Sequence, residues 1–244
     1  MIKLLASECR KVRWPLIFLL IIMEVATSFA LAAGSVKSLT EYFEPNWNTL
    51  YFQAVSKHGM FFLPLFAGLF AAFLCFYEHK NGAWKQLLAL PFPRWKIYLS
   101  KFLMLAILLA ITQIVFMAGY LLTGSIINVE GKIPWKTVLV GAVGGWLACF
   151  PLAMLQIDLS TRFRSFGTAL LFSISVVVPN IVITGLKSFL GAWFPFAPPY
   201  YVMFPQGLNL SPHLEPISFT LILIFTFLIY LLIGFRKFVR KDWI

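Results

Sequence analysis

Charged residues are scarce in this chain of 244 residues, and acidic residues are the scarcest of them. Only 12% of the residues are charged and 60% are hydrophobic. Ordinary soluble domains have about 25% charged and about 45–50% apolar residues, so this composition excludes a typical water-soluble domain. The chain has 20 Lys and Arg residues but only 9 Asp and Glu residues, so its net charge is +11. In a soluble protein, such a charge would favour a nucleic-acid partner.

Cysteine and histidine are also rare, with three residues of each type. Cys9 precedes the first apolar run, and Cys75 and Cys149 lie inside later runs, so no disulfide framework is indicated. The histidines do not form a His-Glu-x-x-His pair, and no complete phosphate-binding glycine loop is present. We therefore expect no enzyme activity, metal or cofactor in this chain itself.

Long apolar runs, by contrast, are abundant. A helix needs about 20 apolar residues to cross a hydrocarbon core about 30 Å thick. Continuous runs without two-residue alternation favour helices over β-barrel strands. The sequence predicts an all-α integral membrane protein that forms one domain over residues 1–244, with six transmembrane helices. The predicted spans are residues 14–33, 59–77, 102–123, 137–157, 167–186 and 217–235.

The first run resembles a cleavable secretory signal, but its length of about 20 residues and its inclusion of Glu24 favour an uncleaved span. Six spans divide the Lys and Arg residues 15 to 5 between the two sides. The positive-inside rule then places both termini in the cytoplasm of a cell-membrane protein. The excess positive charge is explained by topology and anionic lipid, and we expect no nucleic-acid partner.

Two segments outside the spans have helical patterns. Residues 1–13 place apolar side chains at helical spacing with basic residues around them, which predicts an interfacial amphipathic helix. The alternative is a charged tail that only fixes orientation. The cytoplasmic connection over residues 78–101 contains a short helix that ends at Pro91, with Trp84, Leu87 and Leu88 on one face. That face is suited either to a groove on a cytosolic partner or, for the tryptophan, to the lipid interface.

The same connection carries a family resemblance. A basic amphipathic segment precedes the first span, and a second span closes on Glu78. That span is followed by Gly82-Ala83-Trp84-Lys85-Gln86-Leu87-Leu88, Leu90-Pro91 and Arg94-Trp95-Lys96-Ile97-Tyr98 with Ser100-Lys101. This pattern resembles the permeases of ABC type 2 transporters, most of all the small bacterial permeases of lantibiotic-immunity and bacitracin-resistance exporters. The resemblance implies a dimer with a second permease copy or a paralogue, and cytosolic ABC ATP-binding subunits that hold ATP and Mg. It implies that residues 1–13 form a connecting helix and that coupling to the ATPase involves Glu78, Trp84, Lys85, Leu87, Leu88, Leu90 and Arg94.

An ionised Glu24 would be energetically costly, because this residue lies about 15 Å deep in the first span, near the bilayer centre. Glu24 is therefore a candidate, together with Thr27, Ser28 and Gln113, for a translocation path or a polar core. The alternative is a neutral Glu24 that only joins helices by hydrogen bonds. In the fourth span, Gly141 and Gly145 form a Gly-x-x-x-Gly motif for close helix packing, within one subunit or between two.

Residues 187–216 are rich in proline and aromatic residues and cannot form one straight helix. We expect a re-entrant or interfacial external region, and the resemblance implies that it caps the exit. The candidate external gate is Trp193, Phe194, Phe196, Tyr200 and Tyr201, and the alternative is a lid that only packs.

These patterns lead to two hypotheses of function. The first is the membrane subunit of an ATP-driven exporter that removes an antimicrobial peptide or an amphipathic, lipid-like compound for self-immunity or resistance. The second is a non-transporting membrane sensor or assembly scaffold with six spans.

Overall fold

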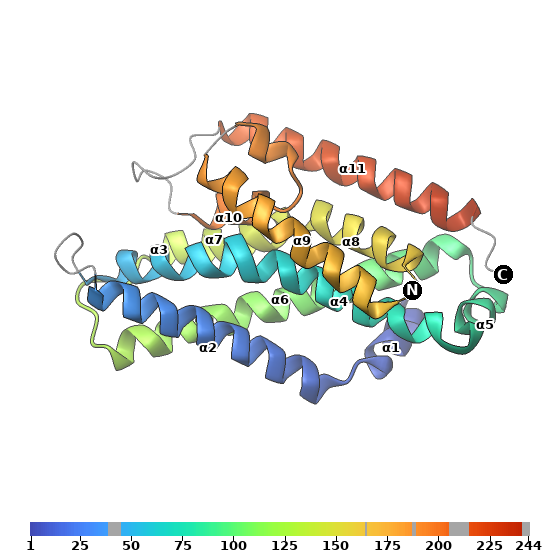
Figure 1. Ribbon diagram of the computed structural model, residues 1–244, viewed down its shortest axis with the longest axis horizontal. Coiled ribbons are helices and arrows are strands. Elements are labelled where there is room, and N and C mark those ends of the chain that lie inside the picture. The colour runs from blue at the N-terminus through green and yellow to red at the C-terminus, as the bar shows by residue number, and fades with distance from the viewer. Residues whose placement is uncertain (39–44, 164, 187–188, 205–214, 241–244) are drawn as a thin grey trace.

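The computed structural model describes residues 1–38, 45–163, 165–186, 189–204 and 215–240. Within these ranges the chain is helical apart from turns and one isolated bridge between Asn46 and Glu130. Most helices run along one long axis (Figure 1). They are α1 (Ile2–Lys11), α2 (Trp14–Ser38), α3 (Trp47–Lys57), α4 (Leu63–His79), α5 (Ala83–Ala89), α6 (Arg94–Ile126), α7 (Trp135–Ala148), α8 (Phe150–Arg162), α9 (Phe166–Gly185), α10 (Pro198–Met203) and α11 (Pro216–Arg240). A π-helix, η1 (His58–Phe62), joins α3 to α4, and two 3₁₀ turns are η2 (Lys80–Gly82) and η3 (Phe189–Trp193).

In the part of the chain that the structure describes, six helical segments are long and apolar enough to cross a membrane, so the prediction of an all-α protein with six candidate spans is confirmed. The second segment runs over Trp47–His79 and the third over Arg94–Ile126, and both extend beyond the predicted residues 59–77 and 102–123. The second extends because its polar residues find partners inside the fold. Lys57 Nζ lies 2.7 Å from Gln53 Oε1 one turn earlier, for example, so the helix continues through these residues without leaving them unpaired.

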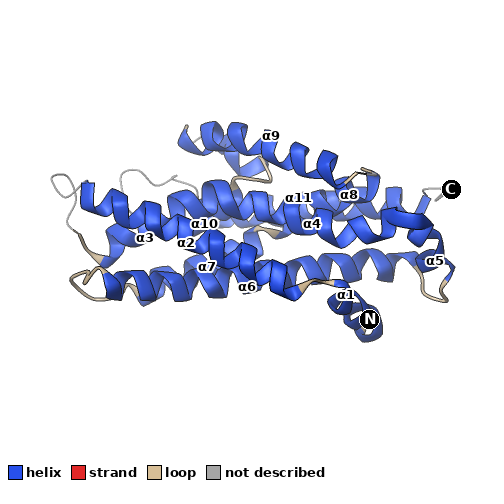
Figure 2. Ribbon diagram, turned by 60° about the horizontal axis from the view of Figure 1, so that its bottom comes forward, coloured by secondary structure: helices blue, strands red, loops and turns tan. Residues whose placement is uncertain are grey.

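The most buried spans are those formed by α3 with α4, by α6, and by α7 with α8, whereas α9 and α11 expose most of their apolar surface. The helices α1 and α5 lie at the same end of the bundle, close to the N-terminus (Figure 1). Figure 2 shows α1 leaving the bundle at an angle, as a helix along a membrane surface would. This end therefore brings together the two segments outside the spans that have helical patterns.

The described part of the external region packs back into the fold. Helix α10 lies along α7, and Phe196, Tyr200 and Tyr201 are buried, while Phe194 is half-buried and Trp193 is exposed. Packing within the fold is enough to explain why Phe196, Tyr200 and Tyr201 are buried. A gating role for this region stays a prediction. Residues 187–188 and 205–214 of the predicted external region lie outside the described residues.

The glycines of α7 permit this close packing. A Cβ on Gly141 would collide with the hydroxyl of Tyr51 in α3, and a Cβ on Gly145 would collide with the side chain of Met203 in α10. The small residues at this spacing therefore serve contacts within one subunit.

Replacing Gly145 with leucine is expected to lower the free energy of unfolding by about 1–3 kcal/mol, because overpacking forces α10 away from α7. Gly34→Leu in α2 is the matched control, since a Cβ there has no neighbour within 4 Å and leucine is the better helix former. Thermal unfolding in detergent measures both variants. Equal unfolding temperatures for the two would contradict the packing described here.

Candidate functional site

A tight turn connects α4 to α5 at the end of the molecule that holds α1 and α5. The apolar run of α4 stops at Glu78 and His79, and Gly82 has a positive φ of 68° that turns the chain into α5. This left-handed conformation is readily available to glycine. Because α5 ends just before Pro91, it is a two-turn helix placed beside the start of α6.

Four charged side chains from three helices form one ion-pair network at this turn. Lys11 Nζ of α1 lies 2.9 Å from Glu8 Oε1 and 2.8 Å from Glu78 Oε1. Lys101 Nζ of α6 lies 3.0 Å from Glu8 Oε2 and 2.9 Å from Glu78 Oε1. Lys101 also donates a hydrogen bond to the carbonyl oxygen of Leu74 at 2.7 Å. Two carboxylates alternate with two ammonium groups, so the network as a whole is neutral.

The network is buried, which makes its pairing energetically important. Glu8, Glu78 and Lys101 are at most 3% exposed, and only Lys11 reaches solvent. An unpaired charge in such a place costs several kcal/mol, whereas here each charged group lies beside two groups of opposite sign. Glu78 Oε2 is the exception among the network's carboxylate oxygens, since it has no hydrogen-bond partner among the described residues. The network consequently holds α1, the end of α4 and the start of α6 in one arrangement.

Trp84 attaches α5 to the same network. Its side chain is buried, and Lys101 Nζ lies 5.3 Å from its ring centroid in a cation–π contact. Its indole Nε1 donates to His79 Nδ1 at 3.3 Å, while His79 Nε2 lies 2.9 Å from the carbonyl oxygen of Ser160. That carbonyl can only accept, so His79 carries its proton on Nε2 and accepts from Trp84. The ring of Trp84 also packs edge-on against Phe238 of α11, with centroids 5.6 Å apart.

A second polar cluster lies inside the membrane-spanning region. Glu24 Oε1 of α2 lies 2.7 Å from His58 Nδ1 of η1 and accepts a hydrogen bond from Ser28 at 3.0 Å. The ring of His58 stacks on Phe116 of α6, with centroids 4.2 Å apart. All of these side chains are buried. Among the described residues, neither Glu24 Oε2 nor His58 Nε2 has a hydrogen-bond partner.

Two of the three residues predicted to lie with Glu24 do not contact it in the structure, and a role of the four in a translocation path stays a prediction. Thr27 is exposed and its hydroxyl donates to the carbonyl oxygen of Met23, which satisfies it on the outer face of α2. Gln113 is buried beside α10, where its Nε2 lies 3.4 Å from Met203 Sδ. Only Ser28, four residues from Glu24, shares its face of the helix. Sequence reasoning missed His58, although a histidine that continues an apolar helix is the kind of residue that partners a buried carboxylate.

Sequence reasoning gave no role to Glu8, and it included Lys101 in the family resemblance without assigning it a contact. Residues 1–13 were interpreted from their apolar and basic positions, yet the buried side of α1 is formed by Leu4 and Glu8, while Ile2 is exposed. The buried side of α1 therefore faces α6 and the helix bundle of the same chain. The sequence did contain one signal for this buried contact, namely Glu8 itself, which is the single acidic residue of an otherwise basic helix.

The profile of a family described as ABC-2 family transporter protein matches residues 4–180, which is well over half of the chain. The chain belongs to the ABC-2 transporter family. No curated protein matches the chain. The matched region includes most of α1, all of α5, the ion-pair network and the Glu24–His58 pair. An ABC-2 permease is a multi-pass membrane subunit that pairs with ATP-binding subunits in a membrane complex.

In this ABC-2 permease, the coupling residues predicted from the sequence divide into anchored and exposed groups. Trp84 faces inward, so the prediction that its ring docks on a partner is corrected: it fixes α5 to its own chain. Arg94 donates to the carbonyl oxygen of Val239 and thereby ties α6 to α11. The outward face of α5 and the residue after it is formed by exposed Lys85, Gln86 and Leu90, with Leu87 and Leu88 half-buried.

Proposed function

We propose that this ABC-2 permease is the membrane-spanning subunit of an ATP-driven exporter, in which α5 is the coupling helix. The observation that carries the proposal is the attachment of α5. Its Trp84 contacts Lys101, and the ion-pair network joins Lys101 to α1 and to the end of α4. A displacement applied to the outward face of α5 is therefore passed to two spans and to the surface helix together.

The proposed complex contains two permease chains, either two copies or this chain and a paralogue, and separate ATP-binding subunits that hold ATP and Mg. We place both termini in the cytoplasm in this arrangement, because the end that holds α1 and α5 carries most of the Lys and Arg residues that the structure describes. No step of ATP hydrolysis is assigned to this chain.

For the substrate, we propose an antimicrobial peptide or an amphipathic, lipid-like compound that is removed from the membrane for immunity or resistance. The resemblance of residues 78–101 to lantibiotic-immunity and bacitracin-resistance permeases supports this class. The Glu24–His58 pair supports it as well, since it places one polar site in an otherwise apolar bundle. Such a site is suited to a ligand that is mostly apolar and carries few polar groups.

Substitution of the outward face of α5 tests the coupling proposal directly. The double variant Lys85→Glu with Leu90→Asp is expected to reduce co-purification of an ABC ATP-binding subunit by about tenfold or more, because it reverses a charge and removes an apolar contact at exposed positions. Affinity capture of the full chain from native membranes, followed by mass spectrometry, measures the ratio of the two proteins.

Lys136→Glu provides the matched control, since this exposed lysine begins α7 at the opposite end of the bundle. It should leave the captured ratio unchanged. Capture of the wild-type chain without any ABC ATP-binding subunit would instead favour the sensor or scaffold. Undiminished capture by the double variant would remove α5 from the coupling interface.

A further inference from the structure

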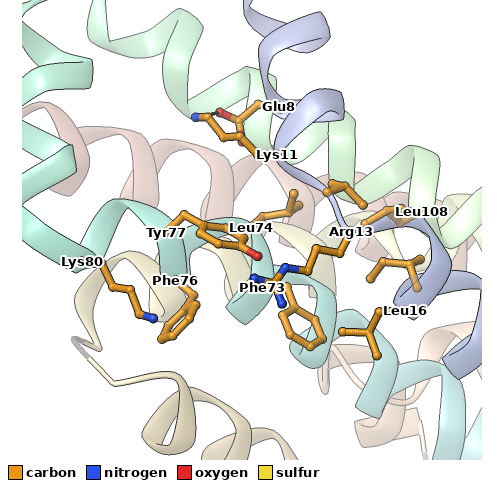
Figure 3. A pocket seen from close by; sticks show the side chains of 12 residues that line it. Glu8, Lys11, Arg13, Leu16, Phe73, Leu74, Phe76, Tyr77, Lys80 and Leu108 are labelled. Atoms are coloured by element: carbon orange, nitrogen blue, oxygen red, sulfur yellow. Dashed lines mark hydrogen bonds and ion pairs between the residues drawn. The ribbon is translucent and has the colours of Figure 1, made fainter.

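A cavity of about 220 Å³ lies between the α1–α2 corner and one face of α4, and no step of the proposed transport cycle uses it. Figure 3 shows Arg13 extending from the corner toward Phe73, and Lys80 lying beside Phe76. Leu16 and Leu108 line the other side of the cavity. The walls are thus apolar, and basic side chains stand at the rim.

The position of the cavity along the helices matches the boundary of a membrane leaflet. Arg13 directly precedes Trp14, the first residue of α2, and Lys80 directly follows the last residue of α4. Both cations therefore lie where two spans end, at the level of lipid headgroups, and Trp14 is the type of residue that marks this level. Phe73 lies six residues before the end of α4, about 9 Å further along the helix toward the acyl chains, and Leu16 begins the apolar wall two residues after Trp14.

The rim carries positive charge that no described carboxylate neutralises. Lys80 Nζ lies 4.5 Å from the ring centroid of Phe76, and neither Lys80 nor Arg13 forms an ion pair with another described residue. Among the described residues that line the cavity, Glu8 is the one carboxylate, and both of its oxygens are already paired, with Lys11 and with Lys101. An anion at the rim would thus meet Arg13 and Lys80, the two lining cations outside the ion-pair network, and no free carboxylate of the described residues.

We propose that this cavity binds one anionic glycerophospholipid from the adjoining leaflet. Its phosphate lies between Arg13 and Lys80, and an acyl chain follows the apolar wall formed by Leu16, Phe73 and Leu108. A lipid in this place contacts both the α1–α2 corner and α4, and so joins the surface helix to a span beside the ion-pair network. Phosphate and a long apolar chain together distinguish this ligand from a soluble anion.

Native mass spectrometry of the full chain in detergent tests the proposal, with equimolar phosphatidylglycerol and phosphatidylcholine as probes. The wild-type chain is expected to retain one phosphatidylglycerol in preference to phosphatidylcholine. The double variant Arg13→Gln with Lys80→Gln should weaken phosphatidylglycerol binding about 25-fold, a factor of about five for each cation near the membrane surface.

The matched control is the double variant Lys3→Gln with Arg10→Gln, which removes the same charge from exposed positions of α1 that do not line the cavity. It should bind phosphatidylglycerol as the wild type does. Leu16→Trp keeps both cations and fills the acyl-chain wall, and it should weaken lipid binding as well. Size-exclusion elution identical to that of the wild type confirms that each variant is folded.

Three outcomes would overturn the proposal. Equal losses in the two double variants would show only general attraction to a basic surface. Displacement of the lipid by equimolar glycerol phosphate, with Leu16→Trp unaffected, would show a site for soluble phosphate. A wild-type dimer that carries no lipid, and that dissociates when Arg13 and Lys80 are changed, would show that a second copy of the chain covers the cavity.

Discussion

Replacing Lys101 with methionine is expected to lower the free energy of unfolding by about 3–5 kcal/mol. The substitution keeps a long apolar stem but removes the fully buried ammonium that pairs with Glu8 and Glu78. Two buried carboxylates are then left with Lys11 alone, and Lys101→Met also abolishes the hydrogen bond to the carbonyl of Leu74. Thermal unfolding of the detergent-purified chain measures the loss.

A compensating variant identifies the network as the cause. Lys101→Met combined with Glu8→Gln restores charge balance, because Lys11 and Glu78 remain as one pair. This double variant should be more stable than the single one, which is the coupling expected of residues in one network. Lys96→Met, which changes a half-buried lysine of the same helix, should stay within about 0.5 kcal/mol of the wild type. Equal losses at positions 96 and 101 would contradict the network.

Replacing His58 with leucine has the second largest expected effect, a loss of about 2–4 kcal/mol in the free energy of unfolding. The carboxyl group of Glu24 would keep only Ser28 as a partner, and a buried polar group without its partner bears the full cost of desolvation. The double variant Glu24→Leu with His58→Leu removes both partners and should be more stable than His58→Leu alone.

Glu24→Gln separates structure from transport at this site. The amide keeps an oxygen that accepts from Ser28 but cannot ionise, so unfolding should change little. If Glu24 belongs to the translocation path, transport or resistance should fall while expression stays normal. Unchanged transport would leave Glu24 as a group that only joins helices. Thr27→Val, at an exposed position three residues away, should alter neither stability nor transport.

The spans were predictable because their signals are local. The length of each apolar run can be read directly from the sequence. The Lys and Arg residues on each side of the predicted spans can likewise be counted without knowledge of contacts. The same holds for the two-turn helix of α5, whose end is set by Pro91. The start of the second span was less predictable, because the helix continues through Lys57 and His58. The partner of Lys57 is Gln53 one turn earlier, but the partner of His58 is Glu24, which lies 34 residues away and meets it only in the folded structure.

The site depended on contacts between distant segments. Glu8 and Lys101 are 93 residues apart, and nothing in either neighbourhood indicates that they meet. The amphipathic pattern of α5 shows that Trp84 lies on an apolar face, but the pattern is the same whether that face covers a partner or its own chain. The face of α1 was misjudged for the same reason, since Glu8 is buried by charges that come from other helices.

A cross-linking measurement tests the central claim that force from an ATP-binding subunit enters this chain at α5. Leu90→Cys places a thiol on the outward face, and Cys9→Ser removes the most accessible native thiol, since Cys75 and Cys149 are buried. With a short thiol-to-amine cross-linker in native membranes, the account predicts a product that contains an ABC ATP-binding subunit, and no such product from Ile126→Cys at the far end of α6. No product at position 90, or equal products at both positions, would contradict it.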